Sequence, residues 1–144
     1  MTKYILPDKI PENAQILDHE ITFNTNIILN KNDTIEIKEN ITLKILSNVK
    51  FTVKRIINHG LLENAGDIAA KSIYNYGKIN NVDLLITDKG KFVNKGLFEN
   101  YYLLYLYRAR TIINSGIINN YEYMGGKIFY ENYKYNGNKI NFLK

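Results

Sequence analysis

The stretch Asn58-His-Gly-Leu-Leu-Glu-Asn64 recurs three more times along the chain, at intervals of 17 to 20 residues. The later copies are Asn75-Tyr-Gly-Lys-Ile-Asn-Asn81, Asn94-Lys-Gly-Leu-Phe-Glu-Asn100 and Asn114-Ser-Gly-Ile-Ile-Asn-Asn120. All four share the pattern N-x-G-x-x-x-N. A fixed short period is typical of stacked copies of one structural unit. The repeat therefore predicts a solenoid and not a mixed globular core.

Within each copy, one apolar residue precedes the first Asn by two positions and another follows it by four. The preceding residues are Ile56, Ile73, Phe92 and Ile112, and the following ones are Leu62, Ile79, Phe98 and Ile118. In an extended strand, residues of one parity point to one side. Both apolar positions share parity with both Asn positions, so all of them are expected to point inward.

Inward-facing Asn side chains need partners, because a buried amide without a hydrogen bond costs a few kcal/mol. Coils that pair in register would place each Asn directly on the next, so that the amides bond in a ladder. We therefore predict two asparagine ladders. The first contains Asn58, Asn75, Asn94 and Asn114, and the second contains Asn64, Asn81, Asn100 and Asn120.

The rest of the chain fits the same coil. Short strands separated by Gly or Asn corners, without a 3.6-residue period, predict an all-β solenoid of about six coils of 16–20 residues. The alternating runs 41–45 and 49–53 supply further strands and complete three faces. Gly60, Gly77, Gly96 and Gly116 are expected to adopt positive φ or to occupy tightly packed corners.

Weaker copies extend the register toward both ends. Asn24, Asn40 and Asn132 fall near the same period and are interpreted as further first-Asn positions. Terminal coils of a solenoid are usually atypical, because they cover an open core. We expect residues 1–21 to form an N-terminal cap, residues 22–138 to form the β-helix as one domain, and residues 139–144 to form a C-terminal tail.

The run 34–45 and the Ile-Ile-Asn-x-Gly units that follow it resemble β-helical repeat proteins of adhesin type, which are also found in giant DNA viruses of amoebae. The similarity covers residues 22–138 and implies a right-handed parallel β-helix with a structural or interaction role. It transfers no catalytic residue. The abundance of Asn, Ile, Lys and Tyr, whose codons are rich in A and T, favours the viral members.

Composition limits the functional classes. The chain has 144 residues, 45% of them hydrophobic, no cysteine and a net charge of +5. Its basic residues are scattered along the sequence, which argues against a nucleic-acid partner. No apolar run is long enough for a membrane span, and the start lacks the apolar stretch of a signal peptide. We thus expect host cytoplasm or virion as the location if the source is viral.

No catalytic, cofactor-binding or metal-binding set emerges. His19 and His59 are the only imidazoles, and no second ligand shares the column of His59. Glu63 and Glu99 share one outward position two coils apart, close to the separation of about 6.5–9.5 Å used by inverting glycosidases. We interpret the pair as part of a solvated face, since Asn80 lies between them.

Two surface features predict partners. The outward apolar residues Ile57, Val93, Ile113, Leu97 and Ile117 predict a covered face. Its cover is either a neighbouring loop or terminal segment of the same chain, or an interface in a homodimer, a homotrimer or a complex with a protein partner. Tyr101, Tyr105 and Tyr107 lie on one side of an alternating run and form a candidate ligand face for a glycan.

The sequence therefore favours a non-enzymatic structural or interaction module without a cofactor, plausibly a viral structural or host-interaction protein. A carbohydrate-binding module that uses the Tyr and Asn side chains is the alternative. A polysaccharide-cleaving enzyme ranks third.

Overall fold

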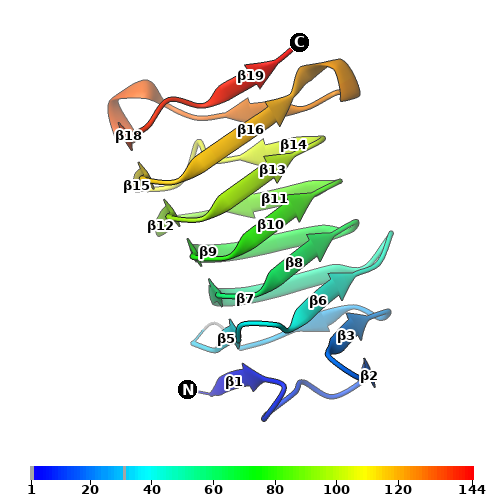
Figure 1. Ribbon diagram of the computed structural model, residues 1–144. Coiled ribbons are helices and arrows are strands. Elements are labelled where there is room, and N and C mark those ends of the chain that lie inside the picture. Colours follow the sequence, from blue (N-terminus) through cyan, green and yellow to red (C-terminus); the bar gives the residue numbers. More distant parts are fainter. Residues whose placement is uncertain (1, 31) are drawn as a thin grey trace.

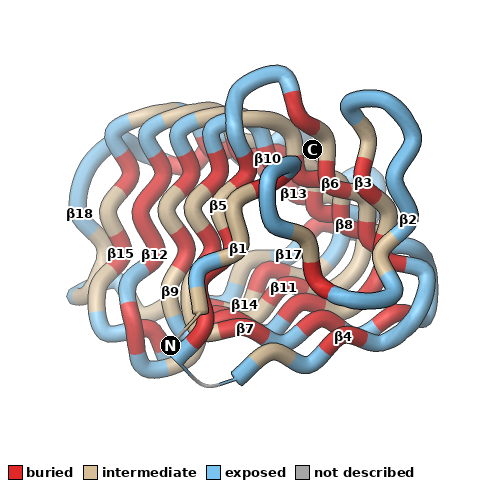
Figure 2. The backbone as a smooth tube through the Cα atoms, turned by 90° about the horizontal axis from the view of Figure 1, so that it is seen from below, coloured by how far each residue is buried: buried red, intermediate tan, exposed pale blue. Residues whose placement is uncertain are grey.

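The computed structural model describes residues 2–30 and 32–144. In it the chain winds into a β-solenoid of about six turns with parallel sheets. The strands nearest the viewer in Figure 1 climb from left to right as the chain rises from the N-terminus to the C-terminus, so the coil is right-handed. Seen along its axis, the solenoid has three faces (Figure 2).

Face 1 and face 3 belong to one 11-stranded sheet, because strands β7 (Lys50–Asn58) and β9 (Asp67–Asn75) bend around the corner between them. Besides the second halves of these two strands, face 1 contains β1 (Lys3–Leu6), β5 (Thr34–Ile37), β12 (Lys91–Asn94), β15 (Thr111–Asn114) and β18 (Tyr135–Gly137). Face 3 contains the first halves of β7 and β9. Its other strands are β4 (Ile27–Ile28), β11 (Leu84–Thr87), β14 (Leu103–Tyr105) and β17 (Lys127–Phe129).

Face 2 is a separate eight-stranded sheet. Its strands are β2 (Ala14–Leu17), β3 (Glu20–Phe23), β6 (Thr42–Ile45), β8 (Leu61–Asn64), β10 (Lys78–Asn81), β13 (Leu97–Asn100), β16 (Ile117–Tyr121) and β19 (Asn141–Leu143). All of its pairings are parallel except that of β2 with β3, which closes the N-terminal edge as an antiparallel hairpin. Two short 3-10 helices, η1 (Glu122–Met124) and η2 (Asn132–Lys134), lie in the last coil.

The terminal segments take part in these sheets. Strand β1 lies within residues 1–21, the predicted cap, and pairs in parallel with β5. Strand β19 lies within residues 139–144, the predicted tail, and pairs in parallel with β16. Parallel coiling therefore begins earlier and ends later than residues 22–138.

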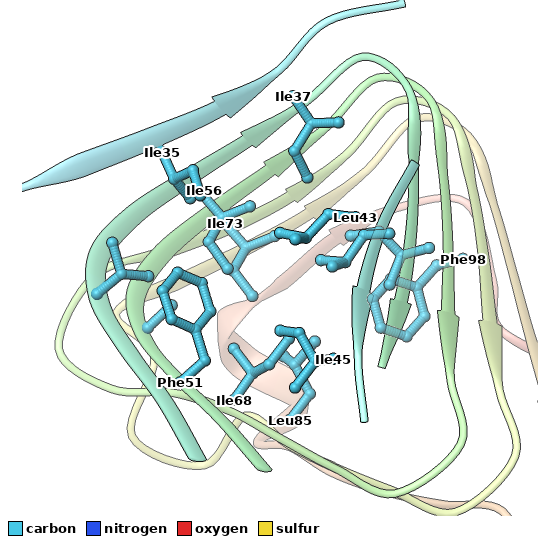
Figure 3. Close-up of a cluster of buried hydrophobic side chains, with 14 of the residues drawn as sticks. Ile35, Ile37, Leu43, Ile45, Phe51, Ile56, Ile68, Ile73, Leu85 and Phe98 are labelled. Atoms are coloured by element: carbon cyan, nitrogen blue, oxygen red, sulfur yellow. The ribbon is translucent and has the colours of Figure 1, made fainter. Parts of the chain in front are cut away.

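The core is a stack of apolar side chains from all three faces, as the repeat predicted (Figure 3). Face 1 contributes Ile35, Ile56 and Ile73, face 2 contributes Leu43 and Phe98, and face 3 contributes Phe51, Ile68 and Leu85. On each face, these residues belong to a series of partners in successive parallel strands and so lie one above the other in a column. The prediction that alternate residues of each strand point into the core is therefore confirmed.

The register at both ends differs from the one expected. Ile37, and not Asn40, pairs with Asn58, while Asn40 lies in an exposed turn with φ of +65°. Phe23 occupies the column of Asn64, so Asn24 falls outside it. At the other end Gly137 pairs with Asn114, and Asn132 lies in η2.

These differences have a physical reason. The terminal Asn of a ladder has an amide neighbour on one side only, and a backbone group must pair with its free side, as the Gly60 N–H does for Asn58. Leu6 and Ile37 continue the first ladder column toward the N-terminus, and Phe23 and Ile45 continue the second. The apolar side chains beyond the ladder ends need no such backbone partner.

Of the two conformations expected for the corner glycines, only the tightly packed one is present. A Cβ built on Gly60, Gly77, Gly96 or Gly116 would lie under 3.0 Å from backbone atoms of the preceding coil. None of these four residues has positive φ, so the left-handed expectation was wrong for them. Among the described glycines, positive φ occurs at Gly125 and Gly137.

Candidate functional site

The first asparagine ladder lies at the corner between face 1 and face 2. The Nδ2 of each Asn donates to the Oδ1 of the Asn in the next coil, at 2.9 Å from Asn58 to Asn75, 2.8 Å from Asn75 to Asn94 and 2.9 Å from Asn94 to Asn114. All four side chains are fully buried. The predicted ladder is present, and its amides all point in one direction.

Each amide also holds the backbone of the turn. Asn75 Nδ2 donates to the carbonyl of Leu97 at 3.1 Å, and Asn58 Nδ2 donates to that of Lys78 at 3.0 Å. At the N-terminal end the Oδ1 of Asn58 accepts the N–H of Gly60. At the other end Asn114 Nδ2 donates to the carbonyl of Asn138. The ladder is satisfied at both ends, which makes it a structural element without free groups for chemistry.

The second ladder repeats this arrangement at the corner between face 2 and face 3. The Nδ2 to Oδ1 distances are 2.9 Å from Asn64 to Asn81, 2.9 Å from Asn81 to Asn100 and 2.8 Å from Asn100 to Asn120. The Oδ1 of Asn64 accepts the N–H of Gly66, and the Nδ2 of Asn120 donates to the carbonyl of Gly126. Both predicted ladders therefore serve the fold.

The outward apolar residues form two columns on either side of the first ladder. On face 1 the apolar column contains Ile57, Tyr74, Val93 and Ile113, in register. On face 2 the column contains Leu61, Lys78, Leu97 and Ile117, also in register. Val93 is only 6% exposed, whereas Ile117 is 51% exposed. The structure thus places all five predicted interface residues on two adjoining outer surfaces.

The tip of that corner separates the two columns. His59 stacks on Tyr76 with ring centroids 4.9 Å apart, and the Lys95 ammonium lies 5.6 Å from the Tyr76 ring centroid. The neighbouring positions of His59, Tyr76 and Lys95 follow from the predicted register.

Ring contacts divide the three predicted ligand-face tyrosines into two sets. Tyr101 follows β13 at a bend and stacks on Tyr121, with ring centroids 4.5 Å apart. Tyr105 lies on the outer side of β14 and contacts Tyr107 at 5.7 Å and Phe129 at 6.1 Å. Because the chain bends at Tyr101, the predicted single strand through all three tyrosines is interrupted. Phe129 was not identified from the sequence, since its register follows only from the irregular last coil.

The two acidic residues of face 2 lie in the predicted register, with Glu63 paired to Asn80 and Asn80 paired to Glu99. Glu99 is 8% exposed, and its carboxylate accepts hydrogen bonds from Tyr121 Oη at 2.7 Å and Asn119 Nδ2 at 3.2 Å. These bonds tie Glu99 to its own sheet, an arrangement unlike that of a free acid in a hydrolytic pair.

The hydrogen bond to the Glu99 carboxylate raises the pKa of the Tyr121 phenol, because ionisation would place two negative charges together; burial raises it further. On face 3, burial raises the pKa of Asp83, and the charge of Asp67 adds to this shift.

Replacing Glu99 with Gln should lower the pKa of Tyr121 toward its ordinary value of about 10, because the negative acceptor is removed while the shape is kept. The pKa would be measured by ultraviolet titration of phenolate, comparing Glu99→Gln with Glu99→Gln/Tyr121→Phe to isolate one ring. A raised pKa that persists in Glu99→Gln would show that burial, and not the carboxylate, causes the shift.

A group of basic residues at the corner between face 3 and face 1 was not recognised in the sequence. It contains Lys54, Arg55, Lys71, Lys89, Lys91, Arg108 and Arg110, and these residues define the basic corner. Lys54 aligns with Lys71 between β7 and β9. The turns above them stack through bonds from Lys89 N to the Arg108 carbonyl and from Arg110 N to the Gly90 carbonyl.

The signal for this corner was present in the spacing. Lys54, Lys71, Lys89 and Arg108 follow one another at 17, 18 and 19 residues, which matches the period of the Asn motif. Charges that look scattered along the sequence thus gather in one line once the chain is coiled. The corner between face 2 and face 3 carries no basic residue at the equivalent positions 65–66, 82–83 and 101–102.

Over the described residues, no group of three or more His, Cys, Asp or Glu side chains is arranged to hold a metal ion. That part of the chain also has no helix of the length and apolar character needed to cross a membrane. No protein-family model, curated protein sequence or solved structure matches the chain. The resemblance to adhesin-type repeat proteins and the viral source stay predictions.

Proposed function

We propose that the protein is a non-enzymatic interaction module that associates with further copies of itself through the outer surface beside the first ladder. The observation that supports this proposal is the column Ile57, Tyr74, Val93 and Ile113, which is apolar through four successive coils. The same column is polar at its two ends, where Glu36 and Asn136 occupy it.

Ile57, Tyr74 and Ile113 are partly exposed in this column, whereas Val93 is buried among its neighbours at 6% exposure. The strands that carry it, β7, β9, β12 and β15, pair only with strands of their own sheet. The last strands, β18 and β19, extend the sheet edges instead of folding back over it. Contiguous outward apolar side chains on a soluble fold mark an interaction surface. Leu97 and Ile117 on the adjoining face would enlarge the area that a second copy covers.

Self-association of this kind usually gives closed symmetry, so a dimer or trimer is the expected product. Each Å² of apolar area that is buried contributes about 25 cal/mol. The sum over the whole interface must exceed the free-energy cost of association. A structural or host-interaction role in a virus would use such an assembly, in keeping with the resemblance.

The double change Val93→Lys/Ile113→Lys should yield a folded monomer. Both side chains point outward, so two ammonium groups would be placed in the interface without entering the core. Sedimentation equilibrium measures the mass, and circular dichroism confirms the fold. Thr52→Lys/Ala69→Lys adds the same charges in two adjacent coils of face 3 and should keep the wild-type mass. A monomeric wild type at high concentration would contradict the proposal.

A further inference from the structure

We infer that the basic corner and the adjoining outer surface of face 3 bind a linear anionic polysaccharide that lies along the solenoid axis. This inference shares with the proposed function the premise of a non-enzymatic module, but it concerns a surface that adjoins the apolar column, with Arg55 against Tyr74 at the boundary. It follows from three features of that surface, namely a row of cations with a single salt bridge over the described part of the chain, a shallow pocket beside it and a group of partly exposed aromatic rings.

The cations of the basic corner have few acidic partners. Among the described residues, Arg108 is the only member that forms a salt bridge, from Nε to Asp88 Oδ1 at 3.1 Å. Lys71, Lys89, Lys91 and Arg110 are exposed. A row of like charges at coil spacing repels itself and gains energy when an anionic partner covers it.

Arg55 adds a more specific feature. Its guanidinium lies 5.9 Å from the ring centroid of Tyr74, and its Nε is buried without a hydrogen-bond acceptor among the described residues. Guanidinium N–H groups bind carboxylate and sulfate oxygens strongly. The buried Nε itself is out of reach of a polymer, so Arg55 contributes to this surface through the positive charge of its partly exposed side chain.

A pocket lies next to the lysines on face 3. It has a volume of about 250 Å³, and its lining includes Thr52, Ala69, Lys54, Lys71 and one acidic residue, Asp88. The Asp88 carboxylate is paired with Arg108, which leaves the two lysines as the unpaired charges of the pocket among the described residues. The small side chains of Thr52 and Ala69 lie in one outward column with the larger Ile86, Tyr105 and Phe129 of the later coils. The change in side-chain size along this column creates the hollow.

The same column ends in aromatic rings. Tyr105, Tyr107 and Phe129 contact one another with centroids 5.7 to 6.1 Å apart, and Tyr107 and Phe129 are 41% and 38% exposed. Aromatic rings pack against the C–H faces of sugar rings, and the Tyr hydroxyl can bond sugar hydroxyls. Arg108 follows Tyr107 directly, so ring and charge occur side by side.

The straight arrangement favours a polysaccharide over a nucleic acid. Successive coils repeat at about 4.8 Å, so the cations form a straight row with coil-sized spacing. Duplex DNA carries a charge about every 1.7 Å on strands that wind around an axis, and a straight row would follow neither strand. Single strands are held by aromatic rings that stack successive bases, whereas here the rings gather at one end.

Titration calorimetry with alginate, a linear polyuronate, tests the inference on the full chain. Wild type should bind alginate, with affinity that falls as salt rises, and should not bind neutral dextran. Lys71→Glu/Lys91→Glu should weaken alginate binding about tenfold or more, since the affinity depends on the cations that meet the polymer. Lys9→Glu/Lys139→Glu changes the net charge equally at two exposed positions outside both surfaces and should alter the affinity by less than about twofold.

Tyr107→Ala should weaken alginate binding without changing its salt dependence, because it removes ring contact and no charge. The inference would be overturned if wild type did not bind alginate, or if it bound dextran equally well. It would also be overturned if the two charge-reversed variants lost affinity equally, or if wild type bound an oligothymidylate more tightly than alginate at the same salt. Val93→Lys/Ile113→Lys should still bind alginate, and its mass reports on self-association. The two proposals can therefore fail separately.

Discussion

We expect Gly96→Ala to lower the free energy of unfolding by about 3 kcal/mol, although only one methyl group is added. A Cβ at Gly96 would approach the carbonyl oxygen of Gly77 and the backbone carbonyl of Tyr76 at distances under 3.0 Å. Those atoms belong to the preceding coil and cannot move without opening the parallel ladder. Chemical denaturation, followed by circular dichroism, measures the loss.

The comparison of replacements separates crowding from backbone conformation. At Gly96, where φ is ordinary, Ala, Asn and Val should all be strongly destabilising, since each carries the Cβ that collides. At Gly125, φ is +97°, and a Cβ would meet only Tyr102 Cδ1 at 3.9 Å. There Asn should be tolerated better than Val, because Asn adopts left-handed backbone angles more readily. A Gly96→Asn protein as stable as wild type would show that the corner can relax.

The periodic part of the sequence predicted the fold well because its rule is local and repeated. Parity about Asn58 and its three later equivalents placed the inward residues of faces 1 and 2 in the middle coils, and stacking then required the two ladders. The corner glycines were predicted less well, since tight packing and positive φ both favour Gly. Only the path of the preceding coil decides between them.

The ends could not be predicted in the same way. Asn40 and Asn132 fall near the expected period, but a terminal coil has a neighbour on one side only, and its pairing depends on how the chain turns there. Ile37 occupies the ladder column because an apolar side chain needs no partner. A count of Asn residues does not show this difference.

The candidate surfaces differ in a related way. The apolar columns of Val93 and Leu97 followed from parity alone, because outward and inward positions alternate along every strand. The basic corner required knowledge of which turns stack, and turn lengths vary from coil to coil. Lys71 lies where β9 bends through the corner without a break, whereas Lys91 follows a turn between β11 and β12 in the next coil. Their charges seemed unrelated in the sequence for that reason.

Asn75→Leu should destabilise the protein by about 2–4 kcal/mol, because it interrupts the first ladder in its middle. Asn75 is fully buried, accepts from Asn58 Nδ2 at 2.9 Å and donates to Asn94 Oδ1 at 2.8 Å. It also donates to the carbonyl of Leu97 at 3.1 Å. Leucine branches at the same carbon but is bulkier, so the variant leaves no cavity, and the loss combines the missing hydrogen bonds with crowding in the core.

The matched control is Asn80→Leu, the same change on the outward side of β10. The Oδ1 of Asn80 has no hydrogen-bond partner among the described residues, so replacing it removes no bond from that atom. We expect this variant to unfold within about 0.5 kcal/mol of wild type. Equal stability of Asn75→Leu and Asn80→Leu in urea denaturation would show that the stacked amides contribute nothing, and that the apolar columns alone hold the coils in register. A large loss for Asn75→Leu alone would show that the amides both stabilise the stack and fix its register, since only in-register coils satisfy them.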